Sequence, residues 1–93
     1  MREPIQPESR PQLAPGCRLS ESPGSEASLM VPEGILKLTG SGRAIIALCD
    51  GRRTFSQIVA ELLSSSHGAP EERIQQDTGT FLTRLRDRGV VEF

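Results

Sequence analysis

Residues 38–51, which we call the decisive stretch, read LTGSGRAIIALCDG. It joins the end of a predicted strand to a short helix over about residues 41–49, for which Ser41 is a candidate N-cap. Asp50 and Gly51 end this helix, because glycine adopts the left-handed conformation at no steric cost. The stretch holds no catalytic constellation, so it predicts a small scaffold that binds something rather than an enzyme.

Composition narrows the classes of partner. The chain has 93 residues, enough for one small domain, and a net charge of −1. This charge argues against bulk nucleic acid or an anionic membrane as the partner. No apolar run approaches the roughly 18 residues of a membrane span, and the first residues lack the apolar segment of a signal peptide. We therefore predict a cytoplasmic protein without a membrane or nucleic-acid partner.

Proline divides the chain into two parts. Five of the seven prolines lie in residues 1–28. Proline fixes φ and removes a hydrogen-bond donor. We therefore predict a disordered, proline-rich N-terminal arm over residues 1–12 and a folded domain over residues 13–93. A turn is predicted at residues 22–25, where serine, proline and glycine cluster.

A β-hairpin is predicted immediately before the decisive stretch. Its strands are residues 29–31 and 35–38, and Pro32-Glu33-Gly34 suits a three-residue loop. Alternation sends Leu36 and Leu38 to one face and Ile35 and Lys37 to the other. A further strand is predicted around residues 17–20, which makes a three-stranded antiparallel sheet.

A second helix is predicted from Thr54, whose hydroxyl forms a capping box with Gln57. Apolar residues recur on one face of this helix at Ile58, Val59, Leu62 and Leu63.

The third helix is predicted over residues 70–88, with Pro70 at its first position and Gly89 as its stop. Its apolar stripe consists of Ile74, Phe81, Leu82 and Leu85, with Thr78 between them. Residues 90–93 are left open between a closing strand and a packed tail. The predicted fold is α+β and winged-helix-like, a small three-stranded antiparallel sheet followed by a three-helix cluster.

The chemically reactive side chains are scattered. His67 is the only histidine and lies in a Ser/Gly-rich loop, where we expect it to be exposed. Cys17 and Cys49 are too few and too far apart for a metal site, and we expect Cys49 to be a small buried apolar residue. We therefore predict no catalytic residue, no bound metal and no cofactor.

An ordered series of residues resembles a known family. The series begins with Pro32-Glu33-Gly34, Leu38-x-x-Ser41 and Ile45-Ile46-x-Leu48-Cys49-Asp50-Gly51, and continues with Thr54-x-x-Gln57-Ile58, Leu62, Asp77, Phe81-Leu82, Leu85 and Gly89. In order and spacing it is similar to the PqqD family of pyrroloquinoline quinone (PQQ) biosynthesis, and more broadly to the peptide-recognition domains of ribosomal peptide-modifying systems. The resemblance covers about residues 13–91. Thr39 stands where the family often has Asn, a minor change because both residues can cap or turn the chain.

The resemblance implies a chaperone-like protein that binds the precursor peptide PqqA and presents it to PqqE, a radical S-adenosylmethionine enzyme that cross-links a Glu and a Tyr of the peptide. Iron–sulfur clusters and S-adenosylmethionine would belong to PqqE.

The residues independently suggest a mechanism. A sheet that ends on residues 35–39 would leave an open edge, and an extended peptide can add there as a further strand. The candidate peptide-binding residues come from this strand and from the third helix: Ile35, Leu36, Lys37, Leu38, Thr39, Ile74, Asp77, Thr78, Phe81 and Leu85. Ile74, Phe81 and Leu85 are equally explained as core residues, and Lys37 as a charge that protects an edge strand.

Two alternatives stay open at this point. A winged-helix DNA-binding transcriptional regulator has the same order of elements, but its recognition helix would carry a basic surface. Residues 70–88 instead balance basic and acidic side chains. An open strand edge also allows self-association as a homodimer, or strand exchange between chains.

Overall fold

The computed structural model describes residues 4–20, 28–32, 34–38, 42–65 and 68–93. The predictions for Thr39, Ser41, His67 and the turn at 22–25 lie outside these residues.

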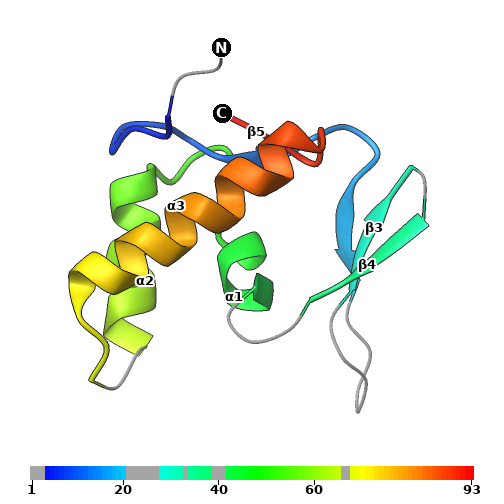
Figure 1. The fold of residues 1–93 in the computed structure, drawn as a ribbon. Coiled ribbons are helices and arrows are strands. Elements are labelled where there is room, and N and C mark those ends of the chain that lie inside the picture. The colour runs from blue at the N-terminus through cyan, green and yellow to red at the C-terminus, as the bar shows by residue number, and fades with distance from the viewer. Residues whose placement is uncertain (1–3, 21–27, 33, 39–41, 66–67) are drawn as a thin grey trace.

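The elements follow one another as strands, helices and a last strand. The strands are β1 (Gln12–Leu13), β2 (Arg18–Ser20), β3 (Ser28–Val31), β4 (Gly34–Lys37) and β5 (Val91–Glu92). The helices are α1 (Gly42–Ala47), α2 (Phe55–Ser65) and α3 (Glu71–Asp87). Figure 1 shows α1 at the centre, with the sheet that contains β3 and β4 on one side and α2 and α3 on the other. This arrangement confirms the predicted α+β fold class.

Two antiparallel sheets are present in the described residues. β2, β3 and β4 form the three-stranded sheet in that order, as predicted. The register pairs Val31 with Gly34, so the hairpin loop has two residues rather than the predicted three. Gly34 has φ 149°, a value that glycine adopts readily, and it begins β4 instead of ending the loop.

The second sheet pairs β1 with β5, in the register Gln12 with Glu92 and Leu13 with Val91. β1 was not predicted, and β5 settles the alternative left open for residues 90–93 in favour of a strand. Ala14 N–H donates to the Val90 carbonyl at 2.9 Å and extends the contact between the two ends of the domain.

Two predicted helix bounds are wrong, the end of α1 and the start of α3. α1 stops at Ala47, short of the predicted residue 49, because the next two N–H groups bond three residues back and tighten the turn: Leu48 to Ile45 at 3.1 Å and Cys49 to Ile46 at 3.0 Å. Pro70 is the N-cap of α3 and not its first helical residue, since its ψ of 144° is extended.

The predicted N-cap of α2 and the predicted stop of α3 at Gly89 are confirmed. Thr54 N–H donates to Gln57 Oε1 at 2.8 Å and Gln57 N–H donates to Thr54 Oγ1 at 3.2 Å, a complete capping box. At the other end of α3, Val90 N–H reaches the Leu85 carbonyl and Gly89 N–H the Arg86 carbonyl, each at 2.9 Å. With Gly89 at φ 76°, this is a Schellman motif.

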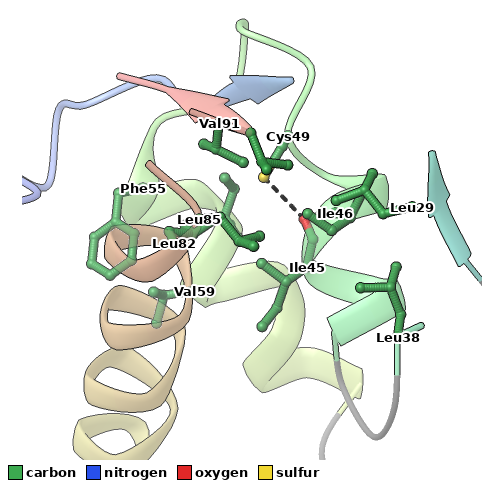
Figure 2. Close-up of a cluster of buried hydrophobic side chains, with 12 residues drawn as sticks. Leu29, Leu38, Ile45, Ile46, Cys49, Phe55, Val59, Leu82, Leu85 and Val91 are labelled. Carbon is green, nitrogen blue, oxygen red and sulfur yellow. Dashed lines mark hydrogen bonds between the residues drawn. The ribbon is translucent and has the colours of Figure 1, made fainter. Parts of the chain in front are cut away.

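One hydrophobic core joins the three-stranded sheet to the helices. In Figure 2, Ile45 and Ile46 of α1 lie between Leu29 and Leu38 on the sheet side and the leucines of α3. Twelve buried residues make up this core: Leu29, Leu38, Ile45, Ile46, Cys49, Phe55, Ile58, Val59, Leu82, Leu85, Val90 and Val91. The helix that follows the decisive stretch is therefore the centre of the packing.

The N-terminal segment contacts the helices. Phe55 N–H donates to the Ser9 carbonyl at 2.6 Å, and Ser56 N–H donates to the Pro7 carbonyl at 3.0 Å. These are first-turn N–H groups of α2, which have no partner within the helix. The domain boundary at residue 12 stays a prediction, but the described residues of the arm do supply the N-terminus of α2 with acceptors.

Candidate functional site

The outer edge of β4 is open within the described residues, because β3 is the only strand that pairs with it. Hydrogen-bonded and non-hydrogen-bonded pairs alternate along an antiparallel ladder. The Val31–Gly34 pair closes a two-residue loop and is the hydrogen-bonded kind. Ile35 and Lys37 therefore direct their backbone N–H and C=O groups away from β3, toward the open edge.

The side chains of β4 alternate as predicted. Leu36 lies opposite the fully buried Leu29 and packs against the core. Ile35 points to the other face, where 65% of its surface is exposed, and it lies opposite Met30, which is 39% exposed. Ile35 of β4 and Met30 of β3 thus form an exposed apolar pair on the outer face of the sheet.

The end of β4 meets α3 at Gly42, the first residue of α1. A Cβ on Gly42 would lie 3.3 Å from Phe81 Cζ and 3.7 Å from Leu38 Cδ2. The shorter distance is tighter than ordinary van der Waals contact, so the missing side chain lets the Phe81 ring approach this corner. Gly42 was not a predicted site residue, although its position between strand and helix in the decisive stretch was a signal.

Toward the N-terminal end of α3, three predicted residues border a hollow of about 400 Å³. We call it the three-helix hollow. It is lined by Ala44 of α1, Leu62 and Ser65 of α2, Ala69 of the following loop, and Ile74, Asp77 and Thr78 of α3. Asp77 is an exposed residue that forms an ion pair of 3.7 Å with Arg73, the two side chains being 72% and 77% exposed.

The predicted site residues therefore fall into groups. Leu38 and Phe81 both lie close to Gly42, whereas Ile74, Asp77 and Thr78 lie together at the three-helix hollow. Leu38, Thr78 and Leu85 are buried, and none of the three offers much surface to a partner. Ala44, Leu62, Ser65 and Ala69 were not predicted as site residues, because small or half-buried side chains from three elements carry no joint signal in the sequence.

The reactive side chains nearest the decisive stretch have structural roles. Burial, reinforced by the charge of Asp50, raises the pKa of the Cys49 thiol to about 12. This thiol donates to the Ile45 carbonyl at 3.2 Å and stays protonated at neutral pH, so it is no nucleophile (Figure 2). The backbone N–H groups of Arg53, the larger contributor, and of Arg52 donate to the Asp50 carboxylate and hold its pKa below the usual value.

The described residues also bound what this site can hold. Within them, no three His, Cys, Asp or Glu side chains come close enough together to bind a metal ion. Nor is any helix in the described part of the chain long and apolar enough to cross a membrane.

The open strand edge beside a three-helix cluster can be compared with known proteins. Residues 26–91 match a family model described as coenzyme PQQ synthesis protein D (PqqD). The chain belongs to the PqqD family. The resemblance predicted from the sequence is thereby confirmed.

Curated PqqD relatives are similar over most of their length. The chain is 37% identical over 84 residues to the PqqA binding protein of Azotobacter vinelandii, covering 88% of each chain. It is 33% identical over 82 residues to the PqqA binding protein of Rhizobium meliloti, covering 87% of this chain and 83% of the relative.

Solved structures agree with this assignment. The solution structure of the PqqD truncation of Methylobacterium extorquens PqqCD, a stand-alone recognition element for ribosomally synthesised and post-translationally modified peptides, superposes with a TM-score of 0.76 at 29% identity. That match covers 96% of this chain and 95% of the other. The heterocyclase TruD matches with a TM-score of 0.61 at 26% identity, over 89% of this chain but 11% of TruD. In TruD the matched region is thus a small part of a much longer chain.

Proposed function

We propose that this protein is a non-enzymatic adaptor of PQQ biosynthesis that binds the precursor peptide PqqA by strand addition at β4. The open edge of β4, in a chain whose relatives are PqqA binding proteins, is the observation that supports this function. The outward N–H and C=O groups of Ile35 and Lys37 would pair with the peptide backbone. Side chains of the peptide would lie over Phe81 and the exposed part of α3.

The ten residues predicted for this site take different parts in the proposal. Ile35 and Lys37 would contribute backbone groups, and Phe81, Ile74 and Asp77 would face the peptide. Thr78 is buried and would support the peptide-facing residues of α3 from behind. Leu36, Leu38 and Leu85 would support the strand and the helix from the core, since they pack against or within it. Thr39 lies outside the described residues, and its part in the site stays a prediction.

Strand addition is tested by replacing Lys37 with proline. Proline has no N–H, and an outward-facing edge position tolerates it without loss of a β3–β4 hydrogen bond. Lys37→Pro should weaken PqqA binding about tenfold, since the variant loses a backbone bond and perturbs its neighbours in the added strand. Lys37→Ala is the matched control, because it removes the same side chain and keeps the N–H.

Isothermal titration of both variants with synthetic PqqA measures the difference, with circular dichroism to establish that they are folded. Equal affinities of the folded proline and alanine variants would contradict strand addition at β4. A parallel titration with duplex DNA at physiological salt addresses the winged-helix alternative, which requires binding to DNA rather than to PqqA.

We further propose that the bound peptide is presented to the radical S-adenosylmethionine enzyme PqqE. This step is tested by the rate at which PqqE cross-links PqqA with and without an equimolar amount of this protein. An unchanged rate at saturating adaptor would contradict presentation while leaving peptide binding intact. Because an open edge can also pair with a second copy, we expect any homodimer formed through β4 to dissociate when PqqA is added, which sedimentation velocity measures.

A further inference from the structure

The three-helix hollow lies outside the contact between peptide and strand edge. Its walls come from three helices and the loop before α3, with Ala44 on one side, Leu62 and Ser65 on another, and Ile74 and Thr78 on α3. Within the described part of the chain, no strand residue lines it. A peptide that only paired with β4 would leave this hollow empty.

The lining suits an apolar side chain. Ala44, Leu62, Ala69 and Ile74 contribute methyl and methylene groups, and Leu62 and Ile74 are half-buried core-edge residues. Among the described lining residues Asp77 alone is charged, and its carboxylate is mostly exposed at the rim. Transfer of an apolar side chain into such a hollow is favourable, whereas a carboxylate would meet a like charge at its entrance.

The distance along α3 links the hollow to the strand edge. Phe81, which like Leu38 lies close to Gly42 after the end of β4, is seven residues after Ile74, or about 10 Å along the helix axis at 1.5 Å per residue. An extended chain advances about 3.3 Å per residue. A peptide that leaves β4 and follows α3 toward its N-terminus would therefore reach the hollow after about three residues.

We propose that the three-helix hollow is a side-chain subsite that holds one large apolar residue of the precursor peptide, about three residues outside its strand-paired segment. The inference rests on the proposed function, because it places the same peptide. It extends the site from backbone pairing, which is tolerant of sequence, to a contact that selects a side chain.

Filling the hollow from its exposed rim tests the subsite. Ala44 is an exposed residue of α1, so Ala44→Phe can turn its ring into the hollow without disturbing the core. Ala47 is also exposed on α1 but does not line the hollow, so Ala47→Phe is the matched control. We expect Ala44→Phe to weaken PqqA binding about tenfold relative to Ala47→Phe, the loss expected when one apolar side chain is displaced.

A second pair of variants repeats the test from the opposite wall. Ser65 of α2 lines the hollow and Ser64 beside it does not, and both are exposed. Ser65→Phe should reproduce the loss of Ala44→Phe, and Ser64→Phe should bind as the wild type does. This pair decides the question if either α1 variant fails to fold.

The peptide side identifies the occupant. Single alanine replacements of the apolar residues of PqqA are titrated against the wild type and Ala44→Phe. One replacement should weaken binding to the wild type about tenfold and have no further effect on Ala44→Phe, because its pocket is already filled. Equal affinities of Ala44→Phe and Ala47→Phe, or full additivity at every peptide position, would overturn the subsite.

These outcomes are separate from those of the proposed function. If Lys37→Pro weakens binding and the hollow variants do not, strand addition stands and the subsite fails. If the wild type does not bind PqqA, the proposed function fails and the subsite fails with it.

Discussion

The two faces of α3 differ in what covers them. On one, which we call the arm face, Ile5 Cγ2 and Phe55 Cζ each lie 3.5 Å from the position of a Cβ on Gly79. On the other, the hollow face, Ile74, Asp77 and Thr78 border the three-helix hollow. The arm face is thus packed against the protein's own N-terminal segment, and the hollow face has room for another molecule.

The character of the two surfaces follows from this difference. The arm face also borders a cavity, of about 420 Å³, but its walls are Pro4 and Ile5 of the arm together with polar α3 residues such as Gln75, Gln76 and Thr80. The three-helix hollow has mainly alkyl walls. The chain's own N-terminal segment therefore stabilises the arm face of α3, and the apolar hollow face is left to a partner.

Of the changes that distinguish the two faces of α3, removal of the arm should have the largest effect on stability. Deletion of residues 1–9 takes away the Ser9 and Pro7 carbonyls that accept from α2, and the Ile5 side chain that packs at Gly79. We expect the free energy of unfolding to fall by about 3 kcal/mol, from two hydrogen bonds of about 1 kcal/mol each and a partly buried isoleucine. Urea unfolding followed by circular dichroism measures the loss.

Deletion of residues 1–3 alone is the control, because it spares those contacts. The affinity of the folded deletion variant for PqqA should change less than about twofold, since the arm lies on the face away from the hollow. An unchanged unfolding midpoint after deletion of residues 1–9 would contradict a structural role for the arm.

Gly79→Ala should have a smaller effect of opposite sign. Glycine within a helix costs about 1 kcal/mol relative to alanine. The added Cβ would meet Ile5 and Phe55 at 3.5 Å, an ordinary van der Waals contact. We therefore expect Gly79→Ala to stabilise the protein by up to about 1 kcal/mol, measured as a higher urea midpoint.

The other side of α3 provides the contrasting variant. At Gly42 the added Cβ would lie 3.3 Å from Phe81 Cζ, so the ring has to shift. Gly42→Ala should therefore change the Phe81 ring resonances in NMR spectra and gain less stability than Gly79→Ala. A loss of stability in Gly79→Ala would mean that the arm packs more tightly on α3 than these distances indicate.

The smallest expected effect concerns Asp50, which supports the turn into α2 beside the arm. Its Oδ1 accepts from the N–H groups of Arg52 at 2.9 Å and Arg53 at 3.0 Å, and these bonds lower its pKa from the ordinary 3.8. A lowered folded-state pKa gives stability that is complete above the unfolded-state pKa and is lost as the pH falls through the folded value.

Asp50→Ala should therefore melt below the wild type at pH 7, and the gap should narrow as the pH drops below 3.8. Thermal melts between pH 2 and pH 7 measure this gap. Asp50→Asn keeps an acceptor oxygen without the charge, so it should melt between the wild type and Asp50→Ala. The difference between the melting temperatures of Asp50→Asn and Asp50→Ala should change little with pH. A gap that is constant with pH would contradict a stabilising carboxylate.

Features with a local cause could be predicted from the sequence. The capping box needs only Thr54 and Gln57 three residues apart, and the stop of α3 at Gly89 needs only a left-handed residue after a helix. The stop predicted at Gly51 was wrong, because α1 already ends at Ala47. Phe55 was missed even though it precedes Ile58, Val59 and Leu62 at helical spacing. There the signal was present and the stripe was begun one turn too late.

Features with a distant cause could not be predicted. β1 and β5 are two residues each and lie at opposite ends of the sequence, so neither has a periodicity of its own. The prolines of the arm predicted disorder because they remove donors. The same residues keep their carbonyls free, and Pro7 and Pro11 use them to accept from Ser56 and Gly51.

The candidate site likewise has a part with a local cause, which could be predicted, and a part with a distant cause, which could not. Strand alternation correctly placed Ile35 and Lys37 on the outside of β4. Helical spacing grouped Ile74 and Phe81 with Leu85, yet only the burial of Leu85 distinguishes it as a core residue. The hollow depends on the distance between α1 and the loop before α3, and no sequence pattern records that distance.

The short β1–β5 ribbon has one more consequence. Because Gln12 pairs with Glu92, the chain enters and leaves the folded unit at adjacent points. Figure 1 shows β5 beside the C-terminal end of α3. Such a unit can be spliced into a longer polypeptide, or joined to a neighbour at either end.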